Sequence, residues 1–143
     1  MFYLDANVLI GALEAGLGGP ALARFILEPN DETHPLHSSE ITLSEVLVGP
    51  LRRADHDLLA RYRVLFGRED IIRLVPLTRG ILERAAELRA GSAMRLPDAI
   101  HVATALTMGC GVILSQDKRL HVPSPAYQID PFTDPITHSR RPG

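Results

Sequence analysis

Short apolar segments alternate along the chain with longer stretches in which apolar residues recur every three or four positions. The short segments predict buried strands at residues 1–5, 34–39, 71–76, 111–115 and 127–130. The stretches between them predict helices at 6–14, 20–28, 41–48, 56–66, from Thr78 through Leu88, and 97–108. Strands separated by helices pair in parallel through crossover connections. We therefore expect a three-layer α/β domain, with a mainly parallel central sheet flanked by helices.

Individual residues mark where these helices begin and end. Ser38 or Ser39 can cap the third helix, and Thr78 can cap the fifth, because hydroxyl side chains accept hydrogen bonds from free N–H groups. Pro97 stands where proline is favoured, in the first turn of the last helix. The pair Gly49–Pro50 should break or kink the third helix, since proline lacks the N–H that the helix needs.

Length and composition narrow the class of protein. The 143 residues fit one compact domain, and a hydrophobic content of 45% can supply its core. A formal charge of −2 gives no global attraction to nucleic acid, so such a partner would need a local basic surface. The sequence contains a single cysteine, Cys110, which excludes an internal disulfide and favours a reducing compartment.

The two ends of the chain carry further expectations. Residues 1–5 lack the basic start of a signal peptide, and no apolar run approaches the roughly 20 residues that span a bilayer. We expect a cytoplasmic protein with no membrane segment. Residues 1–130 form the expected domain, and residues 131–143 form a proline-rich tail with a frayed end.

Four acidic residues stand where ligands bind in parallel sheets, beyond the carboxyl ends of the strands. Asp5 ends the first strand, and Asp117 lies just past the strand at 111–115. Asp98 opens the last helix, and Glu45 is the only charged residue between Ile41 and Leu51. Glu45 interrupts an apolar helix face, where an acid costs stability unless something compensates it.

Each acid also has a purely structural interpretation. Asp5 could cap the first helix, and Asp98 could interact with the positive end of its helix dipole. The segment from Thr42 to Glu45 matches a capping box, and Asp117 could shape a turn. Four such positions together favour a shared site.

Carboxylates that converge raise one another's pKa and need a cation to remain ionised. Their hard oxygen atoms favour Mg²⁺ or Mn²⁺. Such a centre suits the cleavage of a phosphodiester by a metal-activated water. Lys118 and Arg119 directly follow Asp117, near where a phosphate backbone would pass.

Other candidate sites carry weaker signals. The histidines at 34 and 37 have no evident third ligand for zinc. His101 lies one turn after Asp98, either as a packed, hydrogen-bonded residue or in contact with the site. Cys110, between two glycines, is more typical of a small core residue than of a nucleophile.

Four motifs, in order and at matching spacing, resemble the PIN-domain ribonucleases, and among them the VapC-type toxins of toxin–antitoxin pairs. They are YLDANVLI, SEITLSEVLVGPLR, RLPDAIHVATAL and LSQDKRL, and the resemblance covers roughly residues 1–130. It implies a PIN-like fold, metal-ligand and catalytic roles for Asp5, Glu45, Asp98 and Asp117, and supporting roles for Asn7 and Ser115. The chain departs from many members of the family at Ala6, where Thr or Ser is common, and at Ser115, where Thr is commoner.

The resemblance also implies an RNA substrate, a homodimer and a small antitoxin protein. An amphipathic antitoxin helix could dock in an apolar groove lined by Leu9, Leu13, Phe25, Leu59 and Tyr62. Two alternatives remain open, a catalytically inactive PIN-like binding module and a housekeeping PIN-like nuclease without an antitoxin. Phosphoryl-transfer domains of haloacid-dehalogenase or receiver type fit poorly, because only one acid follows the first strand.

Overall fold

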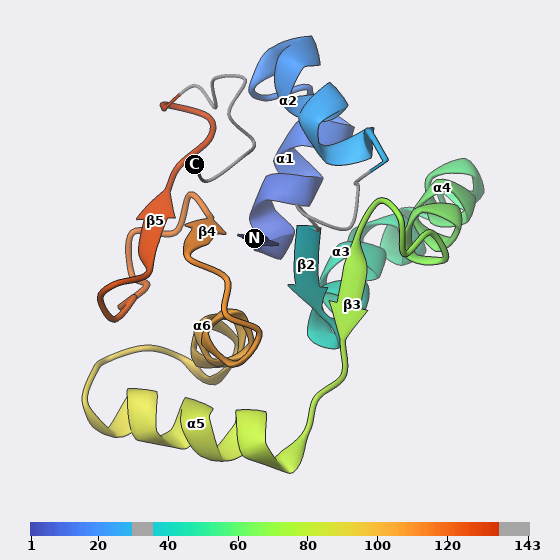
Figure 1. Cartoon of the computed structure of the whole chain (residues 1–143). Coiled ribbons are helices and arrows are strands. Elements are labelled where there is room, and N and C mark those ends of the chain that lie inside the picture. The colour runs from blue at the N-terminus through green and yellow to red at the C-terminus, as the bar shows by residue number, and fades with distance from the viewer. Residues whose placement is uncertain (30–35, 135–143) are drawn as a thin grey trace.

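The computed structural model describes residues 1–29 and 36–134, and within these ranges pairs of helices separate the first four of five strands (Figure 1). The strands are β1 (Phe2–Leu4), β2 (Leu36–Ser39), β3 (Arg73–Val75), β4 (Val112–Leu114) and β5 (Tyr127–Ile129). The helices are α1 (Ala6–Ala15), α2 (Gly19–Leu27), α3 (Glu40–Arg53), α4 (His56–Phe66), α5 (Arg79–Ala90) and α6 (Leu96–Thr107).

The strands form one sheet in the order β3-β2-β1-β4-β5, and every pairing is parallel. From β1 the chain moves outward to β2 and β3, and then returns to the opposite side of β1 for β4 and β5. The strand order therefore reverses between β1 and β4. In parallel sheets, the crevice at the carboxyl ends of two such strands is where ligands bind.

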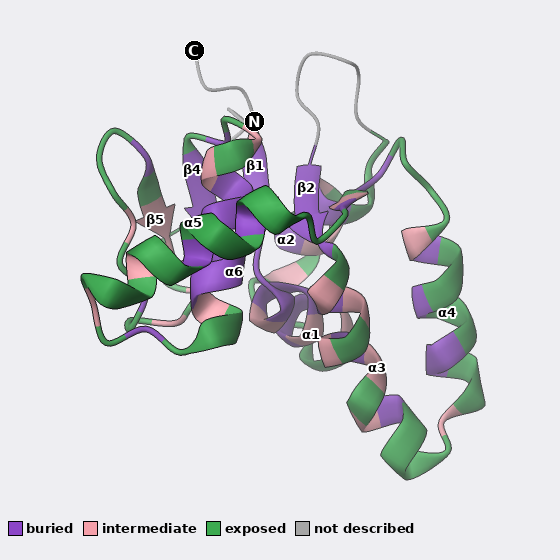
Figure 2. Cartoon of the chain, turned by 90° about the horizontal axis from the view of Figure 1, so that it is seen from below, coloured by how far each residue is buried: buried purple, intermediate pink, exposed green. Residues whose placement is uncertain are grey.

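Alternating side chains of β1 face two separate halves of the core. Phe2 and Leu4 pack into a cluster with residues of α1, α2 and α4, whereas Tyr3 packs with residues of α5 and α6. Helices cover both faces of the sheet, and buried residues fill β1, β2 and β4 and the inner helix surfaces (Figure 2). This arrangement confirms the expected three-layer α/β fold with a parallel central sheet.

Two helices begin at their expected capping residues, and two other expectations are corrected by the structure. Ser39 accepts a hydrogen bond from the Ile41 N–H at the start of α3, and Thr78 does the same for α5. The capping box proposed for residues 42–45 is wrong, because α3 begins at Glu40 and the Thr42 hydroxyl instead bonds to Ser38.

The expected break at Gly49–Pro50 does not occur, and α3 continues to Arg53. Pro50 lies close to the end of the helix, so its missing N–H removes one bond from the last turns only. Its carbonyl accepts a hydrogen bond from the Asp55 N–H, and its ring is buried. Burial of the ring and the bond to Asp55 support this end of α3.

The apolar groove expected on α1, α2 and α4 is not present in the predicted form. Leu9, Leu59 and Tyr62 are buried, and Leu13 and Phe25 pack against the same core. The hydrophobic effect has drawn these side chains inward, because they are the residues that attach the helices to the sheet. Large apolar side chains that remain exposed on α3 and α4 are Val48, Leu51 and Val64.

The chain after β5 packs back onto the domain through Phe132. Phe132 contacts the core beside α1, so closely that a Cβ on Gly11 would lie 2.6 Å from its ring. The rest of the proline-rich tail, 135–143, and the first histidine of the possible zinc pair, at 34, lie outside the described residues. No helix in the described ranges is long and apolar enough to cross a bilayer.

Candidate active site

The four predicted acids come from four separate segments of the fold. Asp5 directly follows β1, and Asp117 lies in the loop after β4. Glu45 is on the second turn of α3, and Asp98 is in the first turn of α6. The two strands that precede Asp5 and Asp117 are those between which the strand order reverses.

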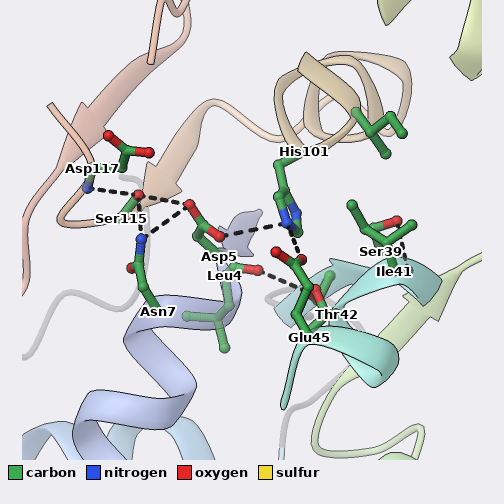
Figure 3. Close-up of polar contacts among 12 residues, drawn as sticks. Leu4, Asp5, Asn7, Ser39, Ile41, Thr42, Glu45, His101, Ser115 and Asp117 are labelled. Carbon is green, nitrogen blue, oxygen red and sulfur yellow. Dashed lines mark hydrogen bonds and ion pairs between the residues drawn. The ribbon is translucent and has the colours of Figure 1, made fainter. Parts of the chain in front are cut away.

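Asp5 is buried, with 5% of its surface exposed, and lies at the centre of the polar contacts (Figure 3). It occupies the N-cap position of α1, yet its side chain makes no capping hydrogen bond. Its Oδ2 atom instead accepts hydrogen bonds from the Ser115 hydroxyl at 2.8 Å and from the Asn7 amide at 3.3 Å. The alternative interpretation of Asp5 as a helix cap is therefore wrong.

Ser115 joins Asp5 to the loop that carries Asp117. Its hydroxyl is fully buried and accepts hydrogen bonds from the Asn7 amide at 3.2 Å and from the Asp117 N–H at 3.0 Å. The carbonyl oxygen of the Asn7 side chain also accepts a bond from the Gln116 N–H. Asn7 and Ser115 together fix the relative positions of the segments after β1 and β4.

Gln128, which no sequence motif singled out, supports the same loop. From β5, its side-chain amide donates to the carbonyl oxygens of Ser115 at 3.0 Å and of Asp117 at 2.8 Å. A polar residue between Tyr127 and Ile129 in a short edge strand was the available signal. Nothing in the sequence indicated which loop it would contact.

Asp98 and Asp117 differ in their electrostatic environment. Burial, followed by the negative charges of Asp117 and Asp5, raises the pKa of Asp98. The pKa of Asp117 is lowered, because the Arg119 guanidinium donates to its carboxylate and the Arg119 N–H adds a further bond. Lys118 is exposed. Asp117 therefore shapes a turn through its bond to the Arg119 N–H and also acts on the neighbouring acid Asp98.

His101 connects Glu45 to Asp5. Its Nε2 atom lies 2.6 Å from Glu45 Oε1 and 3.5 Å from Asp5 Oδ1. Figure 3 shows the ring extending from α6 toward the two carboxylates. Burial opposes its positive charge, but the bond to Glu45 and the nearby carboxylates prevail, so that the pKa of His101 is raised. His101 is therefore both a packed core histidine and a contact of the acid cluster.

The acids are linked but do not converge on one point. Within residues 1–29 and 36–134, no three side chains from Asp, Glu, His and Cys have the spacing of a metal-binding group. His101 connects Glu45, to which it is hydrogen-bonded, with Asp5, which it contacts as an ion pair at 3.5 Å, and the charges of Asp117 and Asp5 both act on Asp98. The donor chemistry nevertheless fits a hard divalent cation, because Asp5 and Asp117 lie in electrostatic reach of Asp98, whose pKa is raised, and Glu45 is joined to Asp5 through His101.

Two other candidates from the sequence lie apart from this cluster. Cys110 is buried in the core against α6, and burial raises its pKa to about 11, as expected of an inert thiol. His37 is buried within β2.

Comparison with known proteins agrees with this architecture. Solved structures with a similar fold include a toxin–antitoxin complex from Klebsiella pneumoniae, at 22% identity and a TM-score of 0.69, with 92% of this chain and 98% of that chain covered. A second is VapC20 of Mycobacterium tuberculosis, described as a sarcin–ricin loop cleaving toxin, at 16% identity and a TM-score of 0.65, covering 82% and 91% of the two chains.

A third is VapBC2 from Rickettsia felis bound to a promoter DNA fragment, at 13% identity and a TM-score of 0.63, covering 86% and 98%. No curated protein matches the sequence significantly. The model of the PIN domain family matches residues 2–123, which include all four acids and both halves of the core. The chain belongs to the PIN domain family.

Proposed function

We propose that this protein is an Mg²⁺- or Mn²⁺-dependent endoribonuclease and the toxin of a type II toxin–antitoxin pair. The observation that carries the proposal is the cluster of acids at the carboxyl edge of the sheet, where the strand order reverses. Burial, together with the negative charges of Asp117 and Asp5, raises the pKa of Asp98 there, and a bound dication would offset this shift. Membership of the PIN family and the likeness in fold to VapC structures support the same function.

In this proposal the cation is held by Asp5, Glu45, Asp98 and Asp117, whose oxygen atoms are the ligands that Mg²⁺ and Mn²⁺ prefer. A divalent cation at such a centre lowers the pKa of water and stabilises negative charge on the phosphate.

The remaining polar residues orient the acids and the substrate. Asn7 and Ser115 hold the Asp5 carboxylate through the bonds to its Oδ2 atom. Lys118 and Arg119 are exposed beside Asp117, where their charges would attract the phosphate backbone of RNA.

The partners belong to the proposal as well. One similar structure is described as a toxin–antitoxin complex and another as bound to promoter DNA, which favours a small antitoxin protein for this chain. The exposed apolar side chains Val48, Leu51 and Val64 on α3 and α4 offer such a protein a hydrophobic surface. We also propose a homodimer that acts in the cytoplasm.

Cleavage of RNA by the purified protein tests the enzymatic part. Cleavage should require Mg²⁺ or Mn²⁺, stop with a chelator and return when metal is added in excess. The products should carry 5′-phosphate and 3′-hydroxyl ends, because water and not the ribose 2′-hydroxyl attacks. Asp98→Asn should lower the rate by two orders of magnitude or more without lowering the melting temperature, since it removes a charge from a crowded site. Undiminished cleavage in excess chelator would contradict the mechanism.

Growth of cells distinguishes a toxin from the two alternatives. Induction of the wild type should arrest growth and induction of Asp98→Asn should not, whereas co-expression of the adjacent small gene should restore growth. A harmless wild type that still cleaves RNA would favour a housekeeping nuclease. A protein that binds RNA without cleaving it in any metal would favour an inactive binding module.

A further inference from the structure

Two consecutive hydrogen bonds connect Tyr3 in the first strand to Glu45 through His101. The Tyr3 hydroxyl lies 2.6 Å from His101 Nδ1, and His101 Nε2 lies 2.6 Å from Glu45 Oε1. Tyr3 and His101 are almost completely buried, with exposures of 0% and 1%. Glu45, in contrast, is partly open to solvent, with 37% of its side chain exposed. The two hydrogen bonds therefore lead from the core to the edge of the acid cluster.

The chemistry of the three groups fixes the direction of these bonds. A carboxylate only accepts hydrogen bonds, so the atom that faces Glu45 at 2.6 Å, His101 Nε2, must carry a proton. In a neutral imidazole the other nitrogen is then an acceptor, and the Tyr3 hydroxyl donates to it. If the ring is instead protonated, Nδ1 donates to the Tyr3 oxygen and Nε2 still donates to Glu45. In both states the ring presents an N–H to the carboxylate.

Packing alone does not account for a tyrosine and a histidine at these positions. The neighbours of Tyr3 in β1 are Phe2 and Leu4, and those of His101 in α6 are Ile100 and Val102. Apolar residues of similar size would fill the same space without burying a hydroxyl and an imidazole. Buried polar groups cost stability unless each is hydrogen-bonded, so their use here points to a task for the bonds that they make.

Glu45 is the acid most in need of such restraint. It is the only one of the four acids that α3 contributes, and the other three come from segments around β1, β4 and α6. Its long side chain loses considerable rotational freedom when it is held in one position. The same His101 nitrogen lies 3.5 Å from Asp5 Oδ1, so one ring nitrogen contacts both carboxylates.

We propose that Tyr3 and His101 are positioning residues, which hold the Glu45 carboxylate beside Asp5 ready for a divalent cation. The inference rests on the proposed metal-dependent function and assigns two residues to it that touch neither cation nor RNA. His101 acts on Glu45 directly, and Tyr3 acts through His101 by fixing the orientation of the ring. Outer partners of this kind commonly change metal affinity or activity by about 10- to 100-fold when they are removed.

Binding of Mn²⁺ to the purified, full-length protein tests the proposal without relying on cleavage. Tyr3→Phe, which removes one oxygen and keeps the ring, should weaken Mn²⁺ binding about 10-fold, and His101→Leu should weaken it about 100-fold. His101→Gln, whose amide can donate to Glu45, should recover part of the affinity. In cleavage assays the Mg²⁺ concentration for half-maximal rate should rise while the KM for RNA stays unchanged.

Tyr62→Phe provides a matched control. Tyr62 is also buried, and its hydroxyl donates to a glutamate, Glu14 Oε2, over the same 2.6 Å. Glu14 is on α1, outside the acid cluster. Both tyrosine variants should lower the melting temperature to a similar extent, but only Tyr3→Phe should weaken Mn²⁺ binding.

Two results would overturn the inference, and they differ in what they say of the proposed function. If the wild type binds Mn²⁺ and both Tyr3→Phe and His101→Gln bind it equally tightly, the hydrogen bonds of Tyr3 and His101 have a structural role only. The nuclease proposal then stands. If the wild type binds no Mn²⁺, the metal-dependent function fails, and the positioning role fails with it. Should His101→Leu not fold, Tyr3→Phe and His101→Gln decide the question by themselves.

Discussion

Replacing Ser115 by alanine removes the hydroxyl that ties Asp5 to the loop carrying Asp117. The hydroxyl donates to a buried carboxylate at 2.8 Å and accepts from the Asp117 N–H at 3.0 Å and from the Asn7 amide at 3.2 Å. Loss of a bond to a charged group costs about 1.5–3 kcal/mol, and water can replace the two accepted bonds because both are only part-buried. We therefore expect Ser115→Ala to lower the free energy of unfolding by about 2 kcal/mol. For a domain of this size that corresponds to a fall in melting temperature of about 6–8 °C.

Thermal unfolding and Mn²⁺ binding measure the two consequences of this change. Ser92→Ala is the matched control, because Ser92 also donates to one group, the Leu88 carbonyl, and accepts from another, the Met94 N–H. Its partners are uncharged and lie in the last turn of α5 and in the loop before α6, so the substitution should cost only about 1 kcal/mol and leave Mn²⁺ binding unchanged. The reasoning would be refuted if Ser115→Ala melted no lower than Ser92→Ala and bound Mn²⁺ as tightly as the wild type.

Three further predictions concern the core, the thiol and the assembly. Gly11→Ala should lower the urea midpoint, because the new Cβ would lie 2.6 Å from the Phe132 ring. Overpacking costs about 1–3 kcal/mol, which exceeds the gain of about 1 kcal/mol in helix propensity. An unchanged midpoint would mean that Phe132 is not docked in solution. Cys110, with its pKa raised to about 11, should react with a thiol reagent at pH 8 far more slowly in the folded than in the urea-unfolded protein, and equal rates would show that it is accessible. Light scattering should report twice the chain mass of 15.7 kDa, and a monomer would argue against the dimer but not against the nuclease.

The sequence by itself determined the order and type of the elements. Apolar runs and helical periodicity gave five strands and six helices in their observed order, because each residue's burial is set largely by its neighbours along one face. The capping roles of Ser39 and Thr78 were also readable, since a cap depends on residues within one turn. A break at Gly49–Pro50 does not occur, because the same dipeptide does not end a helix when it lies near the last turn and its ring is buried.

The sequence also indicated which acids gather at one edge. Asp5 and Asp117 follow strands, and parallel strands deliver their carboxyl ends to the same side of a sheet. It could not indicate that β1 and β4 are neighbours, which follows from the strand order. The prediction of an apolar groove was wrong for a related reason. Periodicity shows that Leu9 and Tyr62 face an apolar surface, but it does not show whether that surface belongs to a partner or to the protein's own sheet.

Only the tertiary structure decided how the acids are held. The bond from Tyr3 to His101 spans 98 positions, that from Ser115 to Asp5 spans 110, and Gln128 reaches the β4 loop from a different strand. A hydrogen bond requires two atoms within about 3 Å and in the right orientation. Local patterns cannot encode that condition for residues so far apart, because it depends on the packing of every element between them.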